Sequence, residues 1–176
     1  MISKRRLAKG ILAGPLLAAC LWPVAGSAQS RVIDGCARGA TSKLVLNVKD
    51  KGARGDGKTN DTAAIQAVLD KAAGTGGTVL VPDGTYMVDA TVRLYPRHDT
   101  MLQLSQGATL KVIPNGATHY GVIAVAAPNV IVDGGTLEGD RDQHQGTAGE
   151  YGYGVHVLAG AENATIRGVT ARKMWG

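Results

Sequence analysis

The sequence has no phenylalanine, and aromatic residues make up only 4% of its 176 residues. A core built on large aromatic side chains is therefore excluded. Glycine is abundant instead, with 25 residues, which suits a fold made of tight turns and small corners. The length is sufficient for one domain.

Cysteine is scarce as well, with only Cys20 and Cys36. Cys20 lies in a segment that we expect to be removed, and a single remaining cysteine cannot form an internal disulfide. Stability must then come from packing and stacking. The sequence around Cys36 supplies no base, so we expect a free thiol without a catalytic role.

An excess of positive charge is absent from the body of the chain. The formal net charge is +5, but four of the 19 basic residues lie in residues 1–28, which contain no acidic residue. The remainder carries 15 basic and 14 acidic residues. We therefore expect no nucleic-acid partner.

The N-terminus also lacks an uninterrupted apolar run. Residues 4–6 are basic, residues 10–25 are apolar but broken by two prolines, and residues 26–28 are small. This order predicts a signal peptide over 1–28 and not a membrane span. We expect export to the periplasm or the extracellular space.

An alternative for the same region is a lipid anchor. Residues 17–20 resemble a lipoprotein box that would leave Cys20 at the mature N-terminus. The apolar residues 21–24 that follow favour simple cleavage. Residues 29–43 are small and polar and are interpreted as a lead-in segment.

A strand–loop–helix–strand unit follows the lead-in segment. Short apolar runs at 44–48 and 78–81 predict strands. Between them, apolar residues at helical spacing predict a helix with one buried face, formed by Ile65, Val68, Leu69 and Ala72.

The loop of this unit, residues 52–59, reads GARGDGKT and matches the phosphate-binding pattern G-x-x-x-x-G-K-[ST]. Residues 129–133 also resemble the strand that ends in a magnesium-binding Asp. Against nucleotide binding, residues 49–51 separate the strand from the first glycine, no second amphipathic helix follows, and export removes the chain from ATP. We therefore interpret the loop as a tight turn plus a capped helix, carried by Asp56, Gly57, Thr59 and Asp61, with Asp61 pairing with the helix amides.

Beyond residue 84 the sequence becomes repetitive, with apolar strands separated by Gly-Thr corners. Four threonines, at 85, 109, 136 and 170, are 24, 27 and 34 residues apart. Units of this length predict stacked coils that bury their inward side chains on one another. The inward candidates are Val79, Val81, Leu102, Leu104, Val130, Val132, Val155 and Ile166. Asn129 and Asn163 start equivalent strands, and either stack on each other inside the coil or simply occupy turns.

The longest spacing results from a polar excursion over 138–154. Its residue types suit sugars, because tyrosine rings stack on pyranose faces and Arg pairs with a uronate carboxylate. The candidate substrate-binding residues are Asp140, Arg141, Asp142, His144, Glu150, Tyr151 and Tyr153. The alternative is a solvated loop held by salt bridges of Asp140 or Asp142 to Arg141 or Arg172.

Two further hypotheses concern the carboxylates of this excursion. Glu138, Asp140 and Asp142 could hold Ca²⁺, which prefers oxygen ligands; no other cofactor is expected. Asp142 and Glu150 could act as the acid and base of glycoside hydrolysis. No metal-ligand spacing joins His144 to His156.

Two motifs carry a resemblance to a known family. Residues 47–66 read NVKDKGARGDGKTNDTAAIQ, and residues 76–86 read GGTVLVPDGTY. Together they resemble the start of the pectate-lyase-like superfamily, which includes rhamnogalacturonase-like, epimerase-like and glycoside hydrolase family 28-related proteins. The sequence departs from the usual pattern at Lys51, where an aromatic is common, and at Asn60, where Asp is frequent.

The resemblance implies an all-β fold, a right-handed parallel β-helix with one N-terminal capping α-helix over 44–176. It also implies that catalytic groups lie on later coils, so no catalytic residue is assigned and the chain is expected to be truncated at its C-terminus. The expected function is an exported protein acting on a pectin-like or alginate-like acidic polysaccharide, as a hydrolase or as a lyase or epimerase. The composition of the excursion slightly favours a hydrolase. The alternative is a non-catalytic glycan-binding or surface β-helix, or an inactive fragment.

Overall fold

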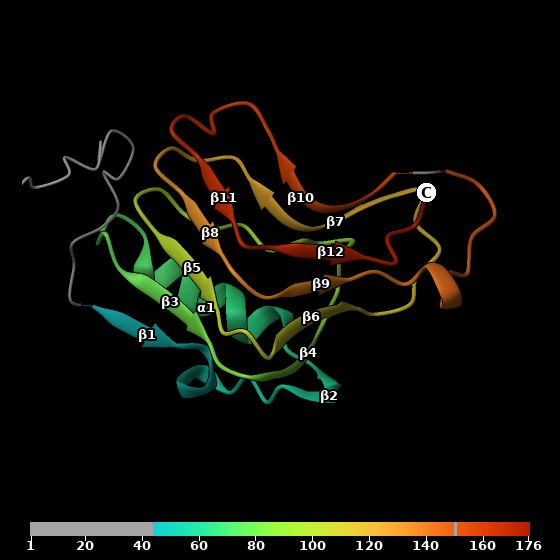
Figure 1. Cartoon of the computed structure of the whole chain (residues 1–176), viewed down its shortest axis with the longest axis horizontal. Helices are drawn as coiled ribbons and strands as arrows, with labels where there is room; N and C mark the ends of the chain where they lie inside the picture. Colours follow the sequence, from blue (N-terminus) through green and yellow to red (C-terminus); the bar gives the residue numbers. More distant parts are fainter. Residues whose placement is uncertain (1–43, 150) are drawn as a thin grey trace, which may run out of the picture. The chain divides into compact units, whose positions relative to one another are not determined.

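The computed structural model of the chain describes residues 44–149 and 151–176 (Figure 1). The predictions of a signal peptide, a lead-in segment, a lipid anchor at Cys20 and a free Cys36 lie outside the described residues, and so does Glu150.

Three parallel sheets form the described part of the chain. The first has five strands in the order β1 (Val45–Asn47), β3 (Thr78–Val81), β5 (Met101–Leu104), β8 (Ile131–Asp133) and β11 (Thr165–Arg167). The second has five strands in the order β12 (Thr170–Arg172), β9 (Thr136–Glu138), β6 (Ala108–Val112), β4 (Gly84–Val88) and β2 (Asp56–Asn60). The third, which we call sheet C, pairs β7 (His119–Val125) with β10 (Tyr151–Val157).

The chain visits the sheets in turn, so each circuit lays a new strand beside the previous one. The predicted threonine repeat marks these circuits: Thr85 pairs with Thr109, Thr109 with Thr136, and Thr136 with Thr170. The unequal spacings are therefore unequal coil lengths in a common register, which confirms the stacked coil. The extra residues leave the stack next to sheet C, where the 3-10 helix η2 (Arg141–Gln143) begins the longest excursion.

The first coils are covered by the helix α1 (Thr62–Ala72) and the 3-10 helix η1 (Val48–Lys51), which pack on each other and on β3 (Figure 1). The predicted apolar face is confirmed, because Ile65, Val68, Leu69 and Ala72 are all buried. α1 ends where Gly74 takes a φ of 67°, in the left-handed region that favours glycine. With 11 residues, α1 is too short to cross a membrane, and the described residues contain no other α-helix.

The core lies inside the coils, between the sheets. Six of the eight inward candidates, those at 79, 81, 102, 104, 130 and 132, are buried. Val155 is only partly buried, and Ile166 is 42% exposed. The prediction fails for Ile166 because β11 has a neighbour, β8, on one side only.

The two equivalent asparagines stack on each other and occupy turns, but not inside the coil, where the first interpretation placed them. Asn163 donates to Asn129 Oδ1 at 3.2 Å, and Asn129 donates to Asp99 Oδ1 at 2.7 Å. All three residues have φ between 54° and 57°, a conformation that Asn and Asp tolerate better than other side chains. They therefore form a ladder in successive turns, partly exposed and outside the core.

Candidate functional site

The loop that matches the phosphate-binding pattern has its amides occupied by the protein's own carboxylates. Asp61 accepts hydrogen bonds from the amides of Arg54 and Gly55 at 2.7 and 3.0 Å. Asp56 accepts from the amides of Lys58 and Thr59 at 2.9 and 2.8 Å. A phosphate would have to displace these carboxylates from the loop amides.

The mechanism of helix capping differs from the prediction. Asp61 makes no side-chain bond to the helix amides; Asn60 Oδ1 accepts instead from the Thr62 amide at 3.1 Å and the Thr62 hydroxyl at 2.6 Å. Asp61 points back into the loop, and residues 56–60 form β2. The exposed Lys58 therefore lies in a strand and not at the start of a helix.

Two of the predicted substrate-binding residues, Asp140 and His144, are buried. His144 Nδ1 lies 3.0 Å from Asp140 Oδ2, and both side chains are fully inaccessible. Asp140 Oδ2 also accepts from the backbone and side-chain amides of Asn115 at 3.0 and 3.1 Å. These contacts attach the excursion to the segment before β7, so the described geometry gives both residues a structural role.

Trp175 closes this cluster. Its indole ring stacks on His144, with centroids 4.2 Å apart and planes 16° apart, and its Nε1 donates to Gly149 O at 2.6 Å. The Trp175 amide donates to the Tyr120 hydroxyl at 2.9 Å. The cluster thereby fixes the segment that leads into β10.

Arg141 and Asp142 hold the segment that follows β12. Arg141 donates to the carbonyls of Met174 and Gly176 at 3.0 Å each, and Asp142 pairs with Lys173 at 2.6 Å. The Lys173 ammonium lowers the pKa of Asp142 and is itself raised in pKa by that carboxylate.

The three carboxylates predicted as candidate Ca²⁺ ligands have separate partners. Glu138 lies between Lys111 at 3.3 Å and Arg172 at 2.6 Å, whereas Asp140 binds Asn115 and His144, and Asp142 binds Lys173. Burial raises the pKa of Glu138, but the two cations outweigh it and the pKa is lowered. Among the described residues no three His, Cys, Asp or Glu side chains form a group that could hold a metal ion. The predicted salt bridges of Arg141 and Arg172 to Asp140 or Asp142 do not form. Arg141 donates to backbone oxygens instead, and Arg172 pairs with Glu138.

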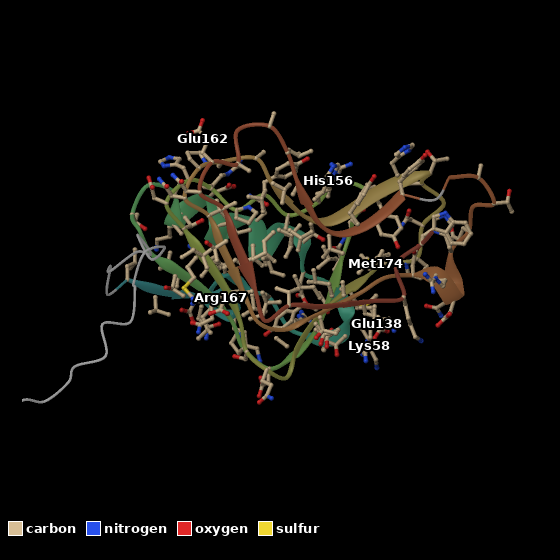
Figure 2. All side chains as sticks on the ribbon, turned by 45° about the horizontal axis from the view of Figure 1, so that its top comes forward. Lys58, Glu138, His156, Glu162, Arg167 and Met174 are labelled. Atoms are coloured by element: carbon tan, nitrogen blue, oxygen red, sulfur yellow. The ribbon has the colours of Figure 1, made fainter. Side chains whose placement is uncertain are left out.

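The two predicted tyrosines lie on sheet C, in β10. Tyr151 is 49% exposed and stacks on His119, with centroids 4.6 Å apart and planes 10° apart. Tyr153 stacks on His156, with centroids 4.3 Å apart and planes 22° apart. Nδ1 of His156 is buried without a partner among the described residues, and Figure 2 places His156 on the side of the molecule that carries sheet C.

Arg93 adds a cation to this face. Its Cδ and Nε lie 3.6 Å from the position that a Cβ of Gly121 would occupy, and Gly121 is the register partner of Tyr153. The missing side chain at Gly121 leaves the arginine room to lie against β7. We call the surface formed by Arg93, His119, Tyr151, Tyr153 and His156 the sheet C face.

The sequence predicted Tyr151 and Tyr153 as candidate binding residues, but it did not predict His119, His156 or Arg93. His119 and Tyr151 become neighbours only through the register of two coils of unequal length. Arg93 carries no sequence motif; its one distinctive property is a φ of 65°, which is visible only in the structure.

Comparison with known proteins agrees with this architecture. Residues 45–111 match the family model "Rhamnogalacturonase A/epimerase, pectate lyase-like". The solved A-module of mannuronan C-5 epimerase AlgE4 from Azotobacter vinelandii superposes with a TM-score of 0.60 at 32% identity, over 73% of this chain and 38% of that one. The described part of the chain is a pectate-lyase-like right-handed β-helix. The predicted resemblance and fold class are thus confirmed.

Two curated relatives show how the similarity of this β-helix is distributed. The uncharacterized protein YclG of Bacillus subtilis is 31% identical over 144 residues, which is 71% of this chain and 24% of that protein. Alginate lyase 7 of Azotobacter vinelandii is 66% identical over 47 residues, 26% of this chain and 5% of that one. The chain spans about a quarter or less of these relatives, so their activities belong to much longer proteins.

Proposed function

We propose that this β-helix binds an acidic polysaccharide along the sheet C face, as part of an exported enzyme that acts on uronate polymers. The observation that carries the proposal is two stacked ring pairs, Tyr151 of β10 on His119 of β7 and Tyr153 on His156 within β10. Rings held in this way present flat apolar surfaces to sugar rings, and their hydroxyl and imidazole groups offer hydrogen bonds to sugar hydroxyls.

The chemistry of this face favours a lyase or epimerase over a hydrolase. Glycoside hydrolysis requires two carboxyl groups on either side of the bond, and the sheet C face as defined contains none. Removal of the C5 proton requires a neutralised uronate carboxylate and a base, for which Arg, His and Tyr are suitable residue types. The names of two relatives, a mannuronan C5-epimerase and an alginate lyase, support the same choice.

The experiment compares wild type with the double variant Tyr151→Ala, Tyr153→Ala in calorimetric titrations with mannuronate and galacturonate oligomers. We expect the double variant to bind the preferred oligomer about tenfold more weakly or worse, since each ring contributes roughly 0.5–1.5 kcal/mol beyond its buried area. The variant Tyr151→Phe, Tyr153→Phe keeps both rings and should bind within a few-fold of wild type. Lys58→Ala, which removes an exposed cation from β2, serves as the control for charge and should leave binding unchanged. Equal affinities of wild type and double alanine variant would contradict the proposal.

A binding module without catalysis is the second candidate, because stacked aromatic rings can bind sugars without any catalytic group. Products separate the alternatives. A lyase yields unsaturated uronates that absorb in the ultraviolet, an epimerase inverts C5 and changes the NMR spectrum, and a hydrolase creates reducing ends. Retention of oligomer without any product would assign the chain to binding alone.

A further inference from the structure

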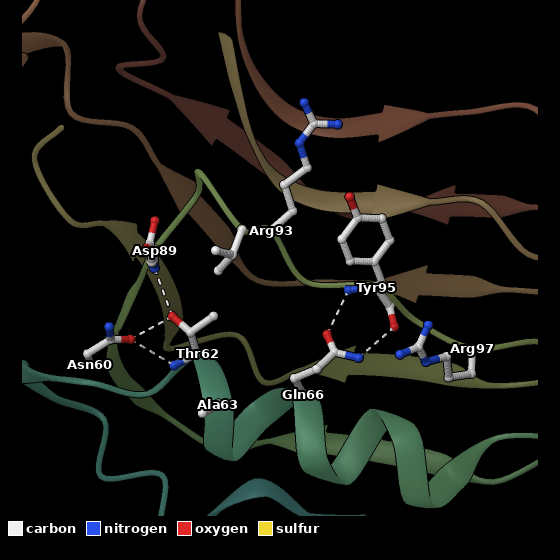
Figure 3. A pocket seen from close by; sticks show the side chains of 9 residues that line it. Asn60, Thr62, Ala63, Gln66, Asp89, Arg93, Tyr95 and Arg97 are labelled. Atoms are coloured by element: carbon white, nitrogen blue, oxygen red, sulfur yellow. Dashed lines mark hydrogen bonds between the residues drawn. The ribbon is translucent and has the colours of Figure 1, made fainter. Parts of the chain in front are cut away.

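A groove of about 490 Å³ lies between the N-terminal half of α1 and the segment 89–97 (Figure 3). We propose that this groove is a carboxylate-binding subsite, in which Arg93 binds a uronate residue of the same polysaccharide that occupies the sheet C face. The inference rests on the proposed function and deepens it, because it assigns to Arg93, the cation of the sheet C face, the contact with the uronate carboxylate.

The walls of the groove are held in place by hydrogen bonds between elements. The Gln66 side chain of α1 donates to the Tyr95 carbonyl at 3.1 Å and accepts from the Tyr95 amide at 2.9 Å. One turn earlier, Thr62 Oγ1 accepts from the Asp89 amide at 2.8 Å. The segment is thus attached to the helix at both ends, and a ligand would meet a preformed site.

Arg93 has no hydrogen bond or ion pair from its side chain to any described residue. Its neighbour in the groove, Arg97, differs in this respect, because it pairs with Asp70 at 2.6 Å. Figure 3 shows the Arg93 side chain and the Tyr95 ring both rising from the segment, away from α1. A guanidinium left without a partner in a groove, beside an aromatic ring, can bind a carboxylate through two parallel hydrogen bonds.

The backbone supports the same conclusion. Arg93 has a φ of 65°, which is uncommon for a residue with a side chain, and its amide donates to Asp89 O at 3.2 Å. Such a conformation costs about 1–3 kcal/mol and persists where the surroundings hold it. A glycine would fit this position without that cost.

The rest of the lining suits a sugar better than a small inorganic anion. Val92 is 59% exposed and offers apolar contact. Asp89 uses Oδ1 to accept from the amide and hydroxyl of Thr91, at 2.9 and 2.6 Å, whereas no described residue donates to its Oδ2. This oxygen can accept a hydrogen bond from a sugar hydroxyl. Since Arg93 also lies against Gly121, the register partner of Tyr153, the groove adjoins the sheet C face.

The test uses Arg93→Gly in the full chain, titrated with mannuronate oligomers and with the same oligomers after chemical reduction of their carboxyl groups. Glycine relieves the backbone at φ 65°, so the variant should melt at or above the wild-type temperature. We expect Arg93→Gly to weaken binding of the acidic oligomer about tenfold to a hundredfold and to leave the reduced oligomer within twofold. Arg93→Lys should recover only part of the loss, because it keeps the charge without the planar fork.

Arg167→Ala is the matched control, since it removes an exposed arginine from β11, where Arg167 pairs with Asp133. It should leave both titrations unchanged. Equal weakening of acidic and reduced oligomers by Arg93→Gly would overturn the subsite, and so would unchanged binding of both. If the double alanine variant of the tyrosines loses binding while Arg93→Gly does not, the result supports the proposed function and contradicts the subsite. Wild type that binds neither oligomer would remove both, and competition by free phosphate alone would identify an anion site unrelated to sugars.

Discussion

At the scale of single residues, the buried Asp61 carboxylate holds the loop that precedes α1. It is 1% exposed and accepts two amides of the loop, those of Arg54 and Gly55. Removing the carboxylate leaves both donors without a partner, at about 1–3 kcal/mol each. We expect Asp61→Ala to lower the free energy of unfolding by about 2–4 kcal/mol in urea titrations. The exposed Asp50 is the control, and Asp50→Ala should stay within about 0.5 kcal/mol of wild type.

The same residue shows where sequence reasoning stops at this scale. The sequence contains Asn60 and Asp61 side by side, and both are good capping residues. Which of them caps the helix depends on the direction in which the loop turns, and that is set by the pairing of β2 with β4. The prediction therefore gave Asp61 a contact with the helix that Asn60 makes instead.

At the scale of elements, the excursion between β9 and β10 should tolerate inserted residues better than the corner between β8 and β9. Insertion of four glycine and serine residues after the exposed Thr147 lengthens a loop and should cost less than about 0.6 kcal/mol. The same insertion after Gly134 should cost several times more. There, Gly134 and Gly135 have φ of 76° and 74° and pass within contact distance of Leu104, so the corner has no room to rearrange. Urea unfolding of the two insertion variants checks this, and equal losses of stability would contradict it.

The elements themselves were predictable where their patterns are regular. The helix, the strand at 78–81 and the threonine repeat follow from periodicity, which is local. The four threonines were expected in corners, but they lie in the strands β4, β6, β9 and β12. Sheet C was not predicted as a separate sheet, because β7 and β10 are joined through long excursions. The pairing of His119 with Tyr151 depends on coil lengths that no local rule supplies.

At the scale of the whole molecule, acid should destabilise the fold. Five carboxyl groups of the described part have lowered pKa values, at Asp56, Asp70, Asp99, Glu138 and Asp142. The amides of Thr59 and then of Lys58 lower the pKa of Asp56 from 3.8 to about 2. A lowered folded-state pKa adds stability above the unfolded-state pKa, and this stability is lost as the pH falls through the folded-state pKa.

We therefore expect the melting temperature to be nearly constant from pH 7 to about pH 5 and to fall between about pH 4.5 and pH 2. Calorimetric melting at half-unit pH intervals measures this. Asp56→Asn should melt at a lower temperature than wild type at pH 7 and should converge toward it near pH 2, where the wild-type carboxyl is protonated. A difference between the two proteins that does not depend on pH would show that the carboxylate charge is not responsible.

The packing of Trp175 on His144 also gives the molecule an optical reporter. Trp175 is the only tryptophan of the described residues, and its indole faces an imidazole 4.2 Å away while its N–H is bound to Gly149. Protonated imidazole quenches indole emission, and separation of the two rings would change both the brightness and the colour of that emission. Fluorescence can therefore follow opening and closing of the segment before β10 in real time, without any attached dye.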